Sequence, residues 1–115
     1  MSTIPYNLKR NDTLPVIVLD VLNSDGDPYD FSDAVGARFI MVEDNVSREV
    51  KVDSFADIVT PATLGRLTYQ FDPTDTDTAL AYVAEFQVEF ATGDIATFPE
   101  SGYMHITIEE DLDAA

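Results

Sequence analysis

The chain has 115 residues, which is enough for one hydrophobic core but not for two ordinary ones. Its 22 acidic residues against 6 basic ones give a net charge of −16, and such a surface repels phosphate backbones and anionic lipid. We therefore expect no nucleic-acid partner and no membrane partner. The absence of cysteine excludes disulfides, thiolate metal sites and cysteine nucleophiles.

The strong acidity has two interpretations. An acidic surface stays hydrated at high salt, where its self-repulsion is screened, so the charge fits a protein from a salt-loving host. It fits an ordinary soluble acidic protein as well. Residues 1–6 contain no basic segment followed by an apolar one, so no signal peptide is expected.

Residues 1–12 are predicted to form an N-terminal arm. Ile4, Tyr6 and Leu8 alternate along it, which predicts a short strand. Pro5 has no backbone N–H to donate, so this strand is expected only at the edge of a sheet.

The most apolar stretch, residues 13–22, predicts a central strand with both faces covered. The cover comes either from the same chain, which we favour, or from a neighbouring subunit. An uncovered apolar strand is a pairing surface for another chain. The candidate interaction surface consists of Tyr6, Leu14, Val16 and Val18.

Two loops, residues 23–28 and residues 72–78, are rich in aspartate. Their candidate ligands for a cation such as Ca²⁺ are Asp25, Asp27, Asp72, Asp75 and Asp77. The first loop lacks the spacing and terminal glutamate of an EF-hand. We favour the other interpretation, in which the side chains close turns and the protein has no cofactor.

Strands are also predicted at residues 37–43, 49–55 and 65–71. In the first, both alternating sets are apolar, so either face can be the inner one. Residues 57–64 are expected to be irregular, with at most one helical turn. The predicted inward side chains of this region are Phe31, Val50, Val52, Phe55, Leu67, Tyr69 and Phe71.

The clearest prediction is the hairpin of residues 80–108. Apolar residues alternate with Glu and Gln along its first strand, as in a strand with one face in water. Gly93 lets the chain reverse, Pro99 interrupts the pairing, and a last strand follows at 103–108. The inward set is Tyr82, Ala84, Phe86, Val88, Phe90, Met104, Ile106 and Ile108.

A short helical turn at residues 77–80 is expected to lead into this hairpin. Tyr82 then stands where immunoglobulin domains carry a tyrosine corner. Residues 109–115 form an acidic tail that frays unless another molecule holds it. About seven or eight short strands with frequent turns predict one domain, residues 1–115, with the fold of an immunoglobulin-like antiparallel β-sandwich.

Several fragments occur in an order that is informative. They are Arg-Asn-Asp-Thr-Leu-Pro at 10–15, Leu-Asn-Ser-Asp-Gly-Asp-Pro at 22–28, Leu-Gly-Arg-Leu-Thr-Tyr at 64–69 and Phe-Pro-Glu-Ser-Gly-Tyr at 98–103, with a strand at 35–41 and Tyr82, Glu85 and Phe86 between them. Together they resemble the immunoglobulin-like N-terminal domain of the tailed-phage baseplate upper protein family. The likeness covers about Lys9 to Leu112. Small virion proteins of tailed viruses are similar.

The resemblance implies a structural module without catalytic residues that docks into a virion. Family members continue into helical and fibre-bearing segments, whereas this sequence ends at Ala115, so we expect a tail, baseplate or capsid-decoration component rather than a fibre carrier. Its expected partners are other virion proteins, in a homo-oligomer or a multi-copy assembly. Its expected location is the virion, assembled in the host cytoplasm.

Two other functions compete with this one. A carbohydrate- or cation-binding module would use exposed aromatics such as Tyr29 and Tyr103 beside the loop 72–77. An enzyme is disfavoured, because His105 is the only histidine and stands at an outward position of its strand.

Overall fold

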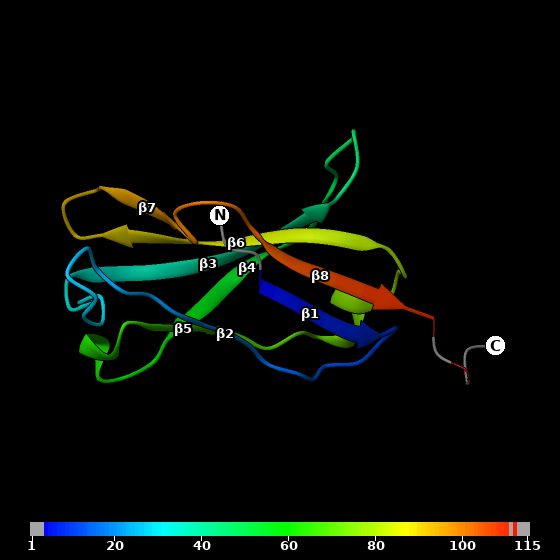
Figure 1. Cartoon of the computed structure of the whole chain (residues 1–115), viewed down its shortest axis with the longest axis horizontal. Coiled ribbons are helices and arrows are strands. Elements are labelled where there is room, and N and C mark those ends of the chain that lie inside the picture. The colour runs from blue at the N-terminus through cyan, green and yellow to red at the C-terminus, as the bar shows by residue number, and fades with distance from the viewer. Residues whose placement is uncertain (1–3, 111, 113–115) are drawn as a thin grey trace.

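The computed structural model describes residues 4–110 and 112. These residues form eight strands: β1 (Ile4–Lys9), β2 (Ile17–Asp20), β3 (Ala34–Glu43), β4 (Val50–Ile58), β5 (Arg66–Tyr69), β6 (Ala81–Phe90), β7 (Ile95–Phe98) and β8 (Met104–Glu109). Two 3₁₀ turns, η1 (Ala62–Leu64) and η2 (Pro73–Thr76), complete the set (Figure 1). No helical segment in this described part has the length and apolar character to cross a bilayer. The predicted all-β sandwich is confirmed.

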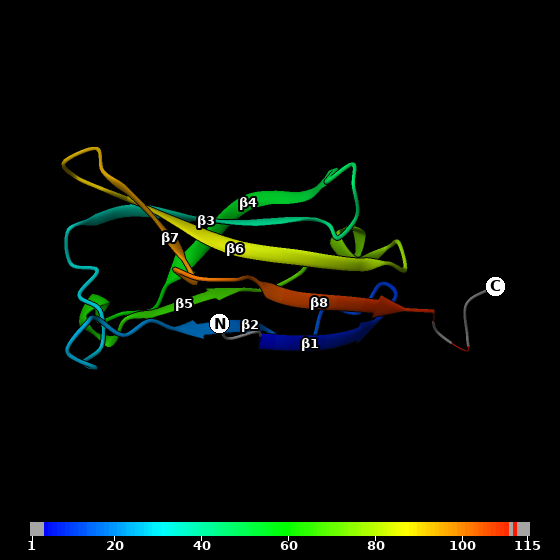
Figure 2. The same ribbon diagram turned by 45° about the horizontal axis from the view of Figure 1, so that its top comes forward.

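The strands follow the order β1-β8-β6-β3-β4-β5-β2, and β7 pairs with β6 beside β8. β4 joins the two layers, because it pairs with β3 along most of its length and with β5 only at Asp57 and Ile58. Figure 2 shows it crossing from the level of β3 and β6 to that of β5 and β2. We call β1, β8, β6, β7, β3 and the first part of β4 the larger layer, and β2, β5 and the end of β4 the smaller layer.

The pairing of β1 with β8 is parallel, and every other strand pair is antiparallel. This differs from the fully antiparallel sandwich that the sequence predicted. A parallel pair needs a long connection, and here the rest of the domain lies between the two strands. Pro5 lies in β1 at the end of the strand order, so the predicted edge strand is confirmed.

β2 differs from its prediction. It has four residues rather than ten, it stands at the other end of the strand order, and only Ile17 and Leu19 point into the core. The prediction of a central strand covered on both faces is therefore wrong. The Tyr6 hydroxyl bridges from β1 to this edge: it donates to the Val18 carbonyl oxygen at 2.8 Å and accepts from the Val18 N–H at 3.3 Å.

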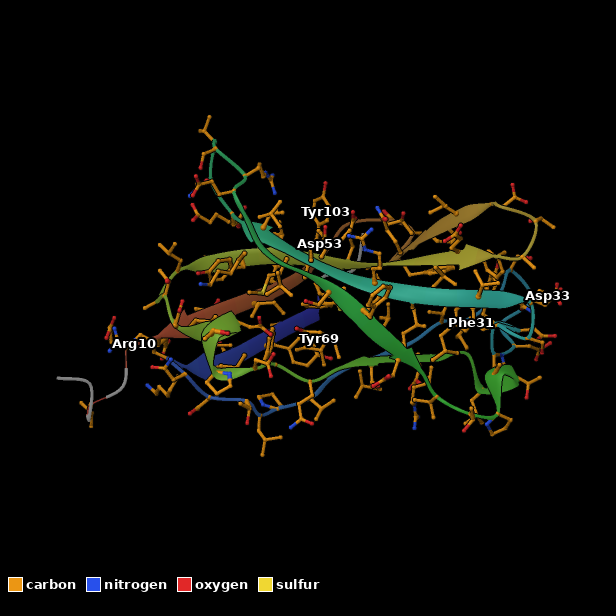
Figure 3. All side chains as sticks on the ribbon, turned by 180° about the vertical axis from the view of Figure 1, so that it is seen from behind. Arg10, Phe31, Asp33, Asp53, Tyr69 and Tyr103 are labelled. Atoms are coloured by element: carbon orange, nitrogen blue, oxygen red, sulfur yellow. The ribbon has the colours of Figure 1, made fainter. Side chains whose placement is uncertain are left out.

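The core lies between the layers and contains two groups of aromatic rings. In the first, Phe39 stacks on Tyr69 with ring centres 4.6 Å apart and meets Phe86 edge-on at 5.2 Å. In the second, Phe31 stacks on Tyr29 at 4.9 Å. Such pairs add roughly 0.5–1.5 kcal/mol beyond the burial of their surface. In Figure 3 Phe31 and Tyr69 lie between the layers.

Most of the predicted inward set is confirmed. The buried members are Phe31, Val52, Leu67, Tyr69, Phe71, Tyr82, Ala84, Phe86, Val88, Met104, Ile106 and Ile108, and Phe90 is half-buried against them. In β3 the inner face is the one with Ala37, Phe39 and Met41, which the sequence left open.

The predicted tyrosine corner is confirmed, because the Tyr82 hydroxyl donates to the Thr78 carbonyl oxygen at 2.9 Å. The helical turn before it lies earlier than predicted, at η2 instead of residues 77–80. Asp72 and Asp75 form a reciprocal capping box around η2, and Pro73 takes its first position. Both features favour the start of a helical turn at this point.

β4 corrects three further predictions. It extends to Ile58, where the sequence predicted irregular chain, and Val50 and Phe55 point away from the core. Phe55 stands an odd number of residues from the buried Val52, so the alternation of the strand turns it outward. Of the predicted arm and tail, residues 1–3, 111 and 113–115 lie outside the described part.

Candidate functional site

The outer side of the larger layer carries large apolar side chains that the core leaves out. Outward residues meet there across the strand register, with Arg38 of β3 between Phe55 of β4 and Gln87 of β6. The exposed apolar members are Phe55 (85% exposed), Ile95 (65%), Val35 (64%), Val50 (62%) and Tyr103 (42%). We call these five residues the apolar outer face. Exposed apolar side chains on one side of a sheet are candidates for contact with a partner.

Two β-bulges add valines to this face. Met41 pairs with Val52 but Val42 pairs with Val50, so Lys51 is the extra residue of a bulge in β4. The extra residue reverses the alternation and turns Val50 outward, beside Val42. Val35 is likewise the extra residue between Ala34 and Gly36 of β3, where the register with β6 shifts.

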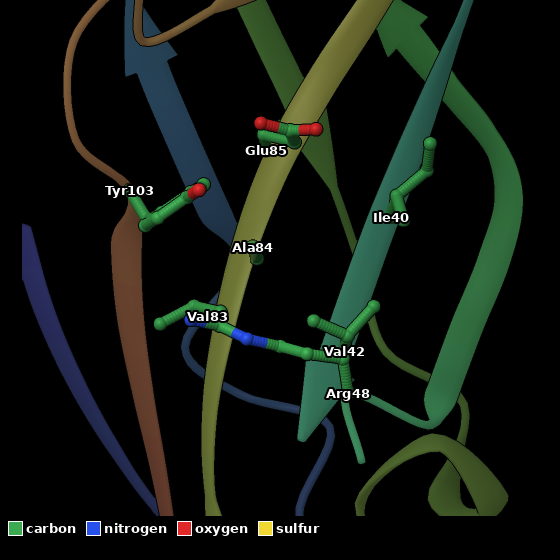
Figure 4. Close-up of a pocket in the computed structure, with 7 residues that line it drawn as sticks. All are labelled: Ile40, Val42, Arg48, Val83, Ala84, Glu85 and Tyr103. Carbon is green, nitrogen blue, oxygen red and sulfur yellow. The ribbon is translucent and has the colours of Figure 1, made fainter. Parts of the chain in front are cut away.

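A hollow of about 260 Å³ lies on this side near the β3–β4 loop. Its lining consists of Ile40, Val42, Arg48, Val83, Ala84, Glu85 and Tyr103 (Figure 4). The Arg48 side chain extends from the loop across Val83 of β6 toward Tyr103, and Glu85 lies further along β6. The guanidinium carbon of Arg48 is 5.8 Å from the centre of the Tyr103 ring, within the range of a cation–π contact.

The backbone of the β3–β4 loop holds Arg48 in place. Arg48 has a positive φ of 51°, which is uncommon for a residue with a side chain. Asn45 organises the turn, since its Oδ1 accepts from the N–H groups of Ser47 and Arg48, each at 3.1 Å. The loop therefore presents the arginine toward the sheet.

Arg48 differs from the other basic residues. Five of the six basic side chains pair with carboxylates: Lys9 with Glu109, Arg10 with Glu110, Arg38 with Asp53, Lys51 with Asp77 and Arg66 with Asp20. Within residues 4–110 and 112, neither Arg48 nor Glu85 has an ion pair or a side-chain hydrogen bond. The hollow thus contains one unpaired cation and one unpaired carboxylate.

A second hollow of about 410 Å³ adjoins the first and shares Glu85 and Tyr103 with it. Its other lining residues include Thr97, Pro99, Glu100 and His105. Together the two hollows form a groove on the outer side of β6 and β8, which we call the β8 groove. His105 is half-exposed in it, at the outward position that the sequence predicted.

The predicted interaction surface, on β1, β2 and the segment that joins them, is only partly exposed. Leu14 and Val18 are exposed, Val16 is half-buried, and Tyr6 is half-buried with its hydroxyl engaged by Val18. Contact through this surface stays a prediction. The apolar outer face, which the sequence prediction missed, exposes more apolar side chains.

The first loop with cation candidates, residues 23–28, is a turn, as favoured from the sequence. Asn23 Oδ1 accepts from the N–H of Asp25 at 2.9 Å and from that of Asp27 at 3.1 Å. Gly26 takes a positive φ of 86°, which completes the reversal. The side chains of Asp25 and Asp27 are not used in these bonds.

In the second loop the carboxylates serve the fold. Asp75 Oδ2 accepts from the Tyr69 hydroxyl at 2.6 Å and from the Asp72 N–H at 2.9 Å. Lys51 pairs with Asp77 and holds the pKa of that carboxyl below its usual range. No group of three or more His, Cys, Asp or Glu is arranged to hold a metal ion in the part of the chain that the structure describes.

The two aromatic candidates for ligand contact differ in position. Tyr29 is half-buried and packs against Phe31 and Phe98, at ring-centre distances of 4.9 and 5.3 Å. Tyr103 is exposed and lies between the two hollows of the β8 groove. Tyr29 also lines a separate hollow, of about 300 Å³, so both rings border a surface hollow and Tyr103 is the more exposed of the two.

Sequence reasoning missed Arg48, Glu85 and Phe55 as surface residues of interest. One signal was present: Ile40 and Val42 are apolar at positions that alternate with another apolar set, so either face of β3 could be the inner one and the other would carry exposed apolar residues. No local pattern marks Arg48, because the hollow that it lines is completed by Tyr103, which lies more than fifty residues away in the chain.

No protein-family model matches the chain, and no curated protein matches it. Among solved structures it is similar to the crystal structure of CopC from Methylosinus trichosporium OB3b. The TM-score is 0.53 and the sequence identity 13%, over 95% of this chain and 87% of that chain. At this identity the likeness shows a shared β-sandwich fold, and a shared fold does not imply a shared function.

Proposed function

We propose that the chain is a non-enzymatic structural protein of a tailed-virus particle, which docks through its apolar outer face onto another virion protein. The observation that carries the docking role is Phe55, a large aromatic side chain that is 85% exposed on β4, where that strand pairs only with β3. Each exposed apolar Å² costs about 25 cal/mol relative to burial, so a partner that covers this ring gains stability.

The surroundings of Phe55 have the composition of a protein–protein interface. Apolar side chains lie beside polar ones, including the ion pair of Arg38 with Asp53 and the outward Gln87 and Glu89. Interfaces commonly combine an apolar centre with a polar rim. Aromatic residues at such a centre contribute a large share of the binding energy.

The placement in a virion is supported by the sequence fragments that resemble the baseplate upper protein domain. An immunoglobulin-like sandwich is the fold that this resemblance implies. Repeated copies in a symmetric particle would each bury the same face, so a single weak contact is multiplied over the assembly. Tail, baseplate and capsid decoration all offer such a repeated arrangement.

The test is incorporation into particles. Tagged wild-type chain, Phe55→Asp and Leu14→Asp are each supplied during virus growth, and their copy number in purified particles is measured by quantitative mass spectrometry. Leu14 is the matched control, because it is also an exposed apolar residue but lies in the segment between β1 and β2, on the predicted interaction surface. We expect the wild type and Leu14→Asp at a fixed copy number and Phe55→Asp strongly depleted.

Each contrary result has one meaning. If neither the wild type nor either variant enters particles, the virion role is wrong. If Phe55→Asp enters as well as the wild type, the outer face is not the docking surface. Depletion of Leu14→Asp alone would indicate that the protein docks through the predicted interaction surface instead.

A second candidate function is carbohydrate binding, with Tyr103 as the observation that favours it. An exposed aromatic ring beside the carboxylates of Glu85 and Glu100 has the composition of a sugar-binding platform. A glycan that binds the folded state should raise the melting temperature of the wild type but not that of Tyr103→Ala. Equal shifts in both proteins would contradict binding at this ring.

A further inference from the structure

The β8 groove has a positive end and a negative end. Arg48 lies at one end, Glu100 belongs to the other hollow, and Glu85 and Tyr103 border both. The apolar lining residues of the first hollow include Ile40, Val42 and Val83. The groove thus has its cation, over Val83, at one end and carboxylates at the other, with Ile40 and the Tyr103 ring along its walls.

The position of Arg48 is not that of a freely solvated arginine. Val83 points outward from β6, opposite Val42 and His105, yet it is only 4% exposed. Figure 4 shows the Arg48 side chain crossing this valine on its way to Tyr103. The methylene stem therefore covers an apolar residue, and the charged group is brought over the sheet.

The guanidinium keeps its capacity to bind an anion. Contact with an aromatic face leaves the N–H donors of a guanidinium available, and those donors match a carboxylate in a two-pronged geometry. The chain has 22 acidic residues, and five of its six basic residues pair with one of them. Arg48 is the exception among the described residues, and it stands at a hollow large enough for a side chain.

We propose that the β8 groove binds an extended segment of the docked partner protein, with a carboxylate of that segment on Arg48 and a lysine or arginine near Glu85 and Glu100. An apolar side chain between the two charges packs against the Tyr103 ring. The inference rests on the proposed docking function and adds the chemistry of the partner. Charge complementarity sets the order, because a segment with the wrong charge at either end leaves a groove charge unpaired.

A short peptide tests this order of charges. In an extended chain every second residue points to the same side, so acetyl-Asp-Ser-Leu-Ser-Lys-amide presents carboxylate, leucine and amine on one side. Two control peptides replace Asp by Asn or Lys by Gln. Binding is followed by backbone amide chemical shifts of the ¹⁵N-labelled protein at millimolar peptide.

We expect shifts confined to β6, β8 and the β3–β4 loop, and dissociation constants about tenfold weaker for each control peptide, which is the loss of one charge pair. In Arg48→Gln the preference for Asp over Asn should disappear while the preference for Lys over Gln stays. In Glu85→Gln the preference for Lys should weaken. Arg66→Gln, which removes a basic residue of the smaller layer, should leave all three affinities unchanged.

The proposal is overturned if the wild type shows no shifts, or if Arg48→Gln still prefers Asp over Asn. A glycan that shifts the Tyr103 amide where the peptide does not would assign the groove to sugar instead. None of these results touches the incorporation of Phe55→Asp into particles, so failure of the peptide site and failure of the docking function are separate outcomes.

Discussion

Two buried tyrosines make the stability of this sandwich fall at alkaline pH. Burial, and then the hydrogen bond to Asp75, raise the pKa of Tyr69 far above its usual range. Burial also raises the pKa of Tyr82, with a further contribution from the negative charges of Glu43 and Asp77. In the unfolded chain both hydroxyls ionise near their ordinary pKa of about 10.

The sign and the size follow from proton linkage. Above about pH 10 the unfolded state has released these protons while the folded state still holds them, so the unfolded state binds fewer protons and stability falls as pH rises. Below that pH the contribution is fully present. The slope is about 1.4 kcal/mol per pH unit for each tyrosine, or about 2.7 for both, until the pH reaches the folded-state values.

The assay is urea unfolding followed by circular dichroism, from about pH 9 to about pH 11, on the wild type, Tyr69→Phe and Tyr82→Phe. Other groups that titrate in this range are common to all three proteins, so the difference between their slopes isolates the tyrosine. Each variant should start about 1 kcal/mol less stable than the wild type, because it lacks the hydrogen bond. This difference should shrink as pH rises, because only the wild type loses stability through that tyrosine. Slopes equal to that of the wild type in both variants would refute the reasoning.

Two more predictions follow from single contacts. A Cβ at Gly65, which has a φ of +66°, would stand 2.6 Å from the Tyr29 nitrogen. Gly65→Ala should therefore lower the free energy of unfolding, measured in urea, by about 2–4 kcal/mol. Gly36→Ala, where a Cβ would meet nothing within 4 Å, should change it by less than about 0.5 kcal/mol. A clear loss in both variants would contradict this. Arg66 Nε donates to Asp20 at 2.6 Å and holds the pKa of that carboxyl down, so Arg66→Gln should raise its NMR titration midpoint. The ion pair stabilises the fold above the ordinary pKa of Asp20, and this stabilisation is lost as pH falls through the lowered pKa of the folded state. In Arg66→Gln it should shrink by less than about 1 kcal/mol, because the pair is half-exposed. An unchanged midpoint would show that Arg66 does not act on Asp20.

The hairpin of β6 and β7 and the last strand β8 were predictable because their signals are local. Alternation from Tyr82 to Val88 defines the buried side, and Gly93 and Pro99 mark the turn and the break in pairing. The tyrosine corner is local as well, since Tyr82 bonds a carbonyl only four residues upstream. Each of these features is determined by residues that are neighbours in the chain.

β2 and β4 show where local reasoning fails. The run of apolar residues before Leu19 suggested a strand covered on both faces, but its place at the edge of the sheet depends on β5 and on Tyr6 of β1. In β4 the alternation alone placed Val50 inward. The bulge at Lys51, which exists only in the pairing with β3, reverses it.

The sequence by itself therefore determined the fold class, the turns and most of the core, because period-two alternation and turn residues act over a few positions. Only the tertiary structure decided which apolar side chains remain at the surface, and that Arg48 of the β3–β4 loop shares a hollow with Glu85 of β6 and with Tyr103, the residue before β8. The reason is physical: the register of strands far apart in the chain sets which side chains share a face. A shift of one residue in that register exchanges the buried and exposed sides of a strand.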